Sequence, residues 1–394
     1  MCAGYRLRRY TLRVGLCAKR IRPPDDSLLA MPIREARHRN TPSVIENRMQ
    51  LELFKDYKTV QISPKVSDGL PATSNKISTE LTAIEICAGA GGQALGLALA
   101  GFTHVALIEY EKEYCNVLKN NRPDWNVVCD DIHNFSGKQY YNKIDLLAGG
   151  VPCPPFSVAG KQLGEADERD LFPEAIRLIS EINPRAVMIE NVRGLLDSRF
   201  DKYRNAILNN IKELGYKVQI KLLNASDFGV PQLRPRVIII AIRNDIKKEF
   251  CYPEAQPQLK LTVGEAIGDL MNTNNWSGYS EWLEKANRIA PTIVGGSKKH
   301  GGPDLGPVRA RKAWESIGID GLGIANASPE SDFVGNPRLT PRMLARIQGF
   351  PDTWNFGEKK TSACRMIGNA FPPPVAKAVG EKIKEVLQDE VTNS

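Results

Sequence analysis

Cys153 is the residue with the clearest capacity for chemistry, and it stands in the stretch Pro-Cys-Pro-Pro-Phe-Ser at 152–157. An apolar run at 144–147, interrupted only by Asp145, precedes it and predicts a buried parallel strand. The prolines fix φ and remove backbone donors, so a thiol after that strand would be held in place before a substrate arrives. The stretch therefore predicts a cysteine nucleophile. A structural cysteine is the alternative, because free cysteines are among the residues most often buried.

A second group of polar residues lies at 232–236, in the order Gln-Leu-Arg-Pro-Arg, before an apolar run at 237–242 that predicts a strand. In an extended chain, which proline favours, alternation places Gln232, Arg234 and Arg236 on one side. A solvated edge strand is the alternative. It accounts for the arginines but not for the regular spacing of the three side chains.

Short apolar runs alternate with helix-like segments from residue 81 onward and would position these residues. Strands are predicted at 81–87, 105–108, 126–129, 144–148 and 186–189, and helices at 93–100, 111–120 and 171–182. This alternation predicts an α/β fold with a mostly parallel, doubly wound sheet. Polar residues that follow the strands, Glu190 among them, would then meet at the edge where ligands bind in such sheets.

The turn after the first strand is rich in glycine, with the sequence Ala-Gly-Ala-Gly-Gly at 88–92, a pattern shared by many nucleotide folds. Glu109 ends the second strand 17 residues after Gly92, close to the spacing of about 20 expected of a ribose-binding carboxylate. Asp131 follows the third strand. Acids at two successive strand ends suit a ribose and an adenine amino group, so an adenosine cofactor is predicted, either NAD or S-adenosylmethionine. The alternative is that both acids only cap helices.

The net charge of +8 is unevenly distributed over the 394 residues. Residues 1–48 carry 11 Lys or Arg against four acids, so a polyanion site elsewhere must be a local patch. We interpret 1–48 as a solvated tail or a mis-assigned start, since few serines disfavour a transit peptide. No apolar run approaches the ~18 residues that span a bilayer. Eight scattered cysteines without a C-x-x-C pair, and four histidines, predict reduced thiols and no metal site.

Residues 253–337 lose the strand–helix alternation and are rich in glycine. This segment has two basic groups, Lys298 with Lys299 and Arg309 to Lys312, and the one acid near them in the sequence is Asp304. Glycines that allow close backbone approach, together with basic side chains, predict a phosphate-binding surface. An irregular solvated loop is the alternative.

Six blocks in one order resemble the DNA (cytosine-5)-methyltransferase family of the bacterial restriction-modification type. They are 85–92, 152–157, 190–192, 232–236, 338–351 and 367–370. The match covers 81–394, and six blocks in family order are highly specific. The resemblance selects S-adenosylmethionine over NAD and implies a Rossmann-like methyltransferase fold. It also implies a catalytic domain at 81–252, an inserted target recognition domain at 253–337 and a returning segment at 338–394. The basic extension at 1–48 and a lead-in at 49–80 precede the match.

The resemblance implies a covalent mechanism. The Cys153 thiolate would add to C6 of a cytosine flipped out of the duplex, and C5 would then take the methyl group. Glu190 would hold N3 and the exocyclic amine. Arg234 and Arg236 would bind the O2 side and steady the loop that carries the thiol.

The same resemblance implies the binding residues. Those for the cofactor are Cys87, Ala88, Gly89, Gly91, Gly92, Glu109, Tyr110, Asp131, Ile132, Pro152 and Asn369. Those for DNA are Ser157, Gln162, Gln232, Thr292, Lys298, Lys299, Arg309 and Arg311. Two departures from the family pattern stand out. Cys87 replaces the usual phenylalanine, which removes an aromatic contact to adenine, and Ala159 stands where a hydroxyl is common.

The expected partner is double-stranded DNA. The expected protein is a monomer in the bacterial cytoplasm, nucleoid-associated when bound to DNA. Its compact size favours the modification partner of a restriction system, functionally linked to a restriction endonuclease without a stable complex. The nearest alternative is a tRNA-methylating branch, although its usual Cys-Phe-Thr tripeptide is absent. A non-catalytic nucleic-acid-binding module is disfavoured by the intact Cys153, Glu190 and Arg236. An NAD-dependent oxidoreductase is disfavoured because 81–250 offers no hydride site.

Overall fold

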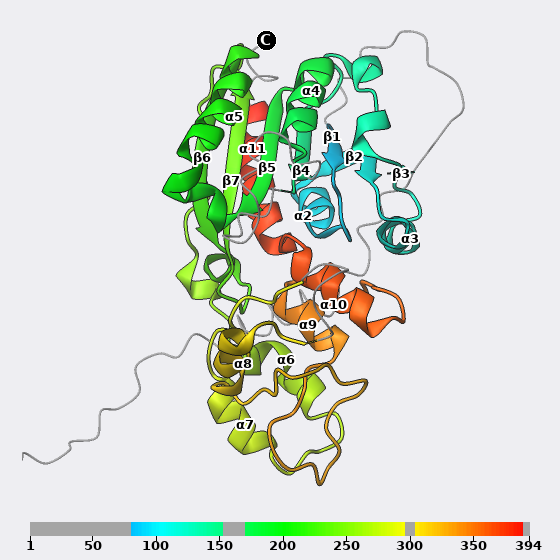
Figure 1. The fold of residues 1–394 in the computed structure, drawn as a ribbon, viewed down its shortest axis with the longest axis vertical. Helices are drawn as coiled ribbons and strands as arrows, with labels where there is room; N and C mark the ends of the chain where they lie inside the picture. Colours follow the sequence, from blue (N-terminus) through cyan, green and yellow to red (C-terminus); the bar gives the residue numbers. More distant parts are fainter. Residues whose placement is uncertain (1–79, 153–169, 296–303, 389–394) are drawn as a thin grey trace, which may run out of the picture. The chain divides into compact units, whose positions relative to one another are not determined.

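The computed structural model describes residues 80–152, 170–295 and 304–388. Its centre is a seven-stranded sheet in the order β3-β2-β1-β4-β5-β7-β6 (Figure 1). The strands are β1 (Leu81–Ile86), β2 (Phe102–Glu109), β3 (Val127–Cys129), β4 (Leu146–Gly150), β5 (Ala186–Val192), β6 (Tyr216–Asn224) and β7 (Pro235–Arg243).

Strands β1 to β5 are parallel, and β1 lies between β2 and β4. The chain therefore winds outward from β1 in one direction and from β4 in the other, which confirms the predicted mostly parallel, doubly wound sheet. Strand β7 pairs antiparallel with β5, and β6 pairs antiparallel with β7. The prediction included β7 as a strand but not its direction, and it did not include β6.

Apolar side chains cover both faces of the sheet, as expected of strands buried on two sides. Ile84, Leu147 and Ile189 pack with α4 (Phe172–Ile182) and α5 (Asp201–Glu213). Ala83, Ala148 and Met188 alternate with them along the same strands and pack with α2 (Gly92–Ala100) and α11 (Pro373–Gln388). Figure 1 shows α5 in front of the sheet and α11 behind it. Five parallel strand ends are thereby fixed at one edge.

Helices α2 and α11 pack unusually closely at Gly96. A Cβ atom at Gly96 would lie 2.4 Å from the Cβ of Ala376, so no larger residue fits there without a shift. This contact brings the end of the chain back to the sheet. Helix α3 (Lys112–Asn121) follows β2.

The described part of 253–337 contains helices and no strand. Its helices are α6 (Val263–Met271), α7 (Tyr279–Ala286) and α8 (Val308–Glu315); α9 (Pro341–Ile347) and α10 (Lys360–Asn369) follow. Trp276, Trp282 and Trp314 are buried in a core that also includes residues of α9 and α10. The predicted loss of strand–helix alternation is confirmed in these residues, and their core is continuous with buried residues of α2 and α3.

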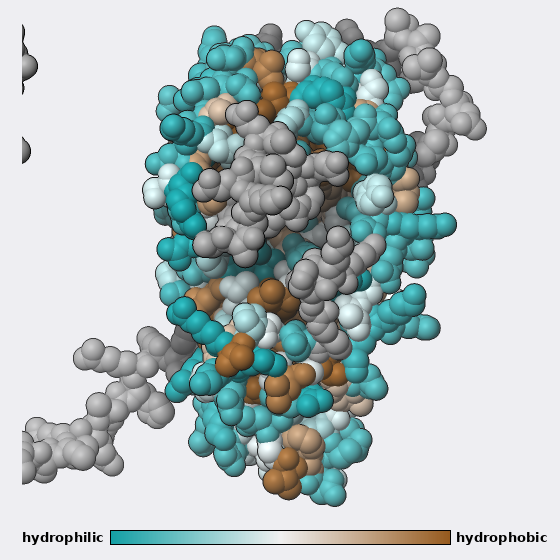
Figure 2. Space-filling model, in the orientation of Figure 1, coloured by the Kyte–Doolittle hydropathy of each residue, from teal (hydrophilic) through white to brown (hydrophobic). Residues whose placement is uncertain are grey.

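The surface in Figure 2 is mostly hydrophilic, with separate apolar patches. Val334 and Leu322 are the most exposed large apolar side chains of the described residues after 303. No described helix is long and apolar enough to cross a membrane.

Candidate active site

The glycine-rich turn after β1 is a tight loop with three left-handed residues. Cys87 has φ +52°, Gly89 +58° and Gly91 +88°. Gly91 caps the N-terminus of α2, and a Cβ at Gly92 would lie 2.2 Å from the carbonyl oxygen of Phe371. The loop is therefore compressed between β1 and the C-terminal segment, with its backbone at the N-terminus of a helix, where anionic groups bind well.

Glu109 reaches from the end of β2 back to this loop. Its Oε2 accepts a hydrogen bond from the Gly89 N–H at 2.7 Å, and its Oε1 accepts one from the Glu111 N–H at 2.8 Å. Burial raises the pKa of Glu109, and these two hydrogen bonds oppose the rise without cancelling it. Each carboxylate oxygen can accept a second hydrogen bond, so both could still receive ribose hydroxyls.

Asp131 serves as a helix cap, which was the alternative interpretation of the sequence. Its carboxylate accepts a hydrogen bond from the His133 N–H at 3.0 Å and contacts the His133 Nδ1 at 2.5 Å. These hydrogen bonds lower the pKa of Asp131, so it is an anion at neutral pH. Capping and ligand binding are compatible here, because the side chain is exposed and half of its acceptor capacity is unused.

The loop and its neighbours fit an adenosine-type cofactor. A Cβ at Gly89 would meet no atom within 4 Å, so the loop faces open space. The ring of Tyr110 is 69% exposed directly after Glu109, as a stacking platform would be. Burial first, and then the Glu109 charge, raise the pKa of the Cys87 thiol, which keeps Cys87 neutral.

The remaining cofactor candidates lie on several segments. Ala88 and Ile132 are buried. Pro152, the last described residue after β4, is exposed. Asn369 lies at the end of α10 against residues 253–337, which we call the recognition segment after their predicted role, because its Oδ1 would be 2.1 Å from a Cβ at Gly295.

Glu190 and Arg236 form an ion pair of 2.7 Å across β5 and β7. Both side chains are largely buried, at 12% and 14% exposure. Burial raises the pKa of Glu190, while the charges of Arg236 and Arg234 oppose the rise. A Cβ at Gly150 would lie 3.3 Å from the Glu190 carboxylate. The pair thus stands over the last residue of β4, three residues before Cys153.

Asn191 fixes the strand end that leads to Cys153, a role that the sequence did not suggest. Its Nδ2 donates to the Val151 carbonyl oxygen at 2.9 Å, and the side chain is buried. The only sequence signal was an amide inside the block 190–192. Cys153 itself, with Ser157 and Gln162, lies outside the described residues.

Of the three residues predicted to alternate along one strand, only Arg236 lies in β7. The side chains of Gln232 and Arg234 contact each other at 3.5 Å, and the Arg234 charge acts on Glu190 as that of Arg236 does. Strand β7 begins at Pro235, and the residues before it pair instead with the recognition segment, where Gln232 bridges to Ala290. Regular alternation therefore does not extend back to Gln232.

Arg234 and Gln232 are buried at 1% and 0% exposure. Arg234 donates to the carbonyl oxygens of Ile293 at 2.9 Å, Gly368 at 2.7 Å and Ala370 at 3.0 Å. Such burial leaves no surface for DNA at Gln232 or for the base at Arg234. Both residues instead join the recognition segment to the C-terminal segment.

The other candidate DNA contacts lie near the recognition segment. The Thr292 hydroxyl donates to the Leu233 carbonyl oxygen at 2.5 Å and is half-buried. On α8, Arg309 is exposed and Arg311 half-buried. Lys298 and Lys299 lie outside the described residues, as does the basic extension at 1–48.

A nucleotide-type loop and a buried acid–arginine pair thus share one sheet edge with the strand that leads to Cys153. The family model described as C-5 cytosine-specific DNA methylase matches residues 81–385. This chain belongs to that family. The predicted family and the Rossmann-like methyltransferase fold are both confirmed.

Relatives within the C-5 cytosine-specific DNA methylases cover nearly all of this match. The Type II methyltransferase M.NgoMIV of Neisseria gonorrhoeae is 55% identical over 314 residues, 79% of this chain and 99% of that protein. M.NaeI of Lentzea aerocolonigenes is 50% identical over 315 residues, 79% of this chain and 76% of that protein. A mutant of Spodoptera frugiperda DNMT2 superposes with a TM-score of 0.56 at 19% identity, over 78% of this chain and 100% of that one, and shows the shared fold.

Proposed function

We propose that this chain methylates C5 of a cytosine within a specific duplex DNA sequence. The single observation that carries the proposal is the Glu190–Arg236 pair, 2.7 Å apart and standing over the strand end that precedes Cys153. Membership of the C-5 cytosine-specific DNA methylases supports it. S-adenosylmethionine, when bound at the glycine loop, would supply the methyl group.

The chemistry requires cytosine C5 to become a nucleophile. In the proposal, the Cys153 thiolate forms a bond to C6, and the C5–C6 π electrons move toward C5 and the N3–O2 side. Glu190, whose pKa is raised by burial, holds a proton at N3, and Arg236 faces the negative charge that grows at O2. After C5 has gained the methyl group, a base removes the C5 proton and the C6–S bond breaks. The cytosine must leave the stack for these contacts to form.

The cofactor assignments follow the positions at the strand ends. Backbone around Gly89, Gly91 and Gly92 would hold the methionine part, Glu109 the ribose and Asp131 the adenine amino group. Tyr110 and Ile132 would flank the adenine. Cys87, Ala88, Pro152 and Asn369 would complete the site.

We further propose that the methylation protects host DNA in a restriction-modification system, because its relatives are Type II methyltransferases. Such an enzyme would act as a monomer on the bacterial chromosome in the cytoplasm, with no stable complex with its endonuclease. The identity to M.NgoMIV extends over 99% of that protein, including its counterpart of 253–337, so we propose a shared target. Duplex DNA already methylated by M.NgoMIV should then accept few further methyl groups, and undiminished acceptance would exclude a shared target.

The function is tested by methyl transfer from tritiated S-adenosylmethionine to duplex DNA and, separately, to tRNA. We expect label in duplex DNA, recovered as 5-methylcytosine. Label only in tRNA would overturn the proposal in favour of the tRNA-methylating branch. Binding of S-adenosylmethionine without transfer to either would indicate a non-catalytic nucleic-acid-binding module.

A further inference from the structure

We infer that Trp354 is a positioning residue for the methyl-donor loop, 88–92, and that it acts through the backbone of Ala90 and Gly91. The Trp354 Nε1 donates a hydrogen bond to the Ala90 carbonyl oxygen at 3.2 Å. Both residues are buried, at 4% and 2% exposure. The inference rests on the proposed function, which gives this loop to S-adenosylmethionine.

The indole ring also limits the position of the next residue. A Cβ at Gly91 would lie 2.8 Å from the Cζ2 atom of Trp354, closer than real Cβ atoms come, so the ring lies directly against the Gly91 backbone. Gly91 has φ +88° and is the N-cap of α2. One side chain therefore holds two successive residues at the point where the loop enters the helix.

The ring has little freedom to move away from the loop. The rings of Trp125 and Phe350 lie beside it in tilted contacts, with their centroids 6.1 Å and 5.9 Å from that of Trp354. The Arg122 guanidinium lies 5.2 Å from the ring centroid, a favourable cation–π distance. Three side chains on two segments, the turn after α3 and the turn after α9, thus hold the Trp354 ring in place.

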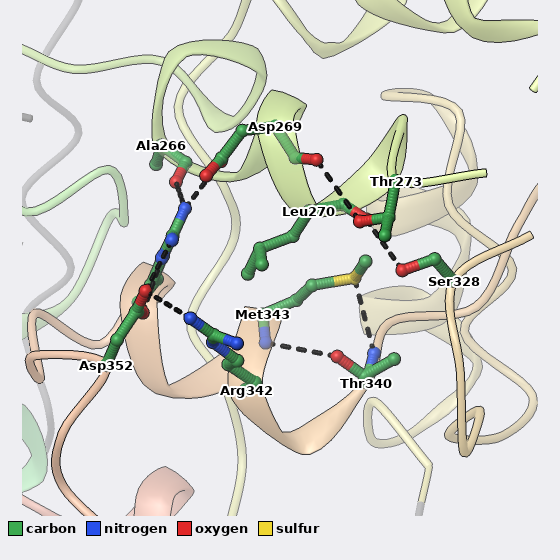
Figure 3. Close-up of polar contacts among 10 residues, drawn as sticks. Ala266, Asp269, Leu270, Thr273, Ser328, Thr340, Arg342, Met343 and Asp352 are labelled. Carbon is green, nitrogen blue, oxygen red and sulfur yellow. Dashed lines mark hydrogen bonds and ion pairs between the residues drawn. The ribbon is translucent and has the colours of Figure 1, made fainter. Parts of the chain in front are cut away.

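The turn that carries Trp354 is anchored by ion pairs, which Figure 3 shows around Asp352. The Asp352 carboxylate accepts two hydrogen bonds from Arg346, at 2.6 Å and 2.5 Å, and one from Arg342, at 2.6 Å. The buried Arg346 also contacts Asp269 of α6 at 2.5 Å. The Asp352 pKa is lowered by these hydrogen bonds, so the anchor is charged at neutral pH. The turn is therefore tied to the recognition segment on one side and supports the loop on the other.

A loop fixed in this way loses less conformational freedom when the cofactor binds. Without the indole N–H, the Ala90 carbonyl oxygen loses a buried hydrogen bond and the loop can sample other positions. A purely structural tryptophan would affect stability but not cofactor binding. The two roles can be separated because the chain offers a matched tryptophan.

Trp276 is the matched control. It is 5% exposed, and its Nε1 donates to the Phe333 carbonyl oxygen at 2.7 Å, within the recognition segment. Trp354→Phe and Trp276→Phe each remove one buried indole hydrogen bond and keep an aromatic ring. We expect both to lower Tm by similar amounts. Only Trp354→Phe should raise the KM for S-adenosylmethionine, by about 3- to 10-fold at saturating DNA with kcat within about twofold, the equivalent of one net hydrogen bond.

Unchanged KM in Trp354→Phe, or equal KM increases in both variants, would overturn the inference. Asp352→Asn, which weakens the anchor of the turn, should raise the same KM to a smaller extent and provides the test should Trp354→Phe not fold. If the protein without substitutions transfers no methyl group from S-adenosylmethionine, the proposed function is wrong. That outcome differs from failure of the inference, in which the protein is active but the KM of Trp354→Phe is unchanged.

Discussion

Glu190 and Arg236 form a 2.7 Å ion pair where the parallel part of the sheet meets its antiparallel edge. Glu190 lies opposite Gly150 on one side and Ile238 on the other, so Arg236 is its diagonal neighbour on the same face. Because both side chains are largely buried, water screens their attraction little. The pair is thus a rigid acid–arginine unit at the end of the strand that precedes Cys153.

Arg236→Ala should lower kcat for methyl transfer by about 100-fold or more, because charge that grows on the base loses its fixed partner. Arg243→Ala is the matched control, since Arg243 ends the same strand and pairs with the exposed Asp245 at 2.8 Å. It should leave kcat within about twofold, because Arg243 lies at the opposite end of β7 from Arg236. Steady-state transfer of tritiated methyl measures both. A near-normal kcat in Arg236→Ala would contradict the role of the pair.

Arg234→Met should destabilise the folded chain by about 3 kcal/mol, because it leaves buried carbonyl oxygens on two segments without a donor. Chemical denaturation measures this loss. Arg309→Met, at an exposed site on α8, should change the free energy of unfolding by less than about 0.5 kcal/mol. Equal stabilities of the two variants would show that Arg234 does not join the segments it contacts.

Arg309→Ala should weaken DNA binding by a similar factor for all sequences. If Arg309 neutralises one phosphate, the slope of log binding constant against log salt should fall by about one. Fluorescence anisotropy with duplex DNA at several salt concentrations measures the slope. An unchanged slope would mean that this face of α8 does not contact the DNA backbone.

Glu85→Gln should raise Tm at pH 8, and the gain should disappear near pH 4.5. Burial raises the pKa of Glu85 above its ordinary value of 4.5, against a smaller opposing effect of His104. A carboxyl group whose pKa is raised in the folded state costs stability progressively as the pH rises from its unfolded-state pKa to its folded-state pKa, and glutamine avoids this cost. Thermal unfolding across this pH range gives the comparison.

Glu281→Gln is the control of opposite sign. Lys285 lowers the pKa of Glu281, so that carboxylate stabilises the fold above pH 4.5. Its replacement should lower Tm slightly at pH 8. A lower Tm for Glu85→Gln at pH 8 would contradict the assigned cost of the buried charge.

The sequence predicted the ends of the parallel strands well, because a strand buried on both faces is a continuous apolar run that stops at its polar residue. Glu109 and Glu190 were found in this way, and both lie at the predicted edge. Strand β6 was missed because its exposed side, with Lys217 and Lys221, breaks the apolar run. Its signature is apolar residues at every second position, Tyr216, Val218 and Ile220, and not a continuous apolar run.

The positions of Gln232 and Arg234 could not be predicted because they depend on a tertiary partner. Local alternation assumes a regular strand, whereas these residues pair with a segment about 60 residues later in the chain. The Trp354 contact with Ala90 is also of this kind, since 264 residues separate the two. Neither spacing nor composition carries information on such distant contacts.

The central claim, that Cys153 attacks C6 of a cytosine, is tested most directly by covalent trapping. A duplex carrying 5-fluorocytosine at the target cannot lose a proton from C5, so the enzyme should stay bonded to the base after methyl transfer. Mass spectrometry of the protein incubated with this duplex and S-adenosylmethionine should show a covalent complex attached at Cys153, and Cys153→Ser should form none. A complex attached elsewhere, or one that persists in Cys153→Ser, would contradict the mechanism.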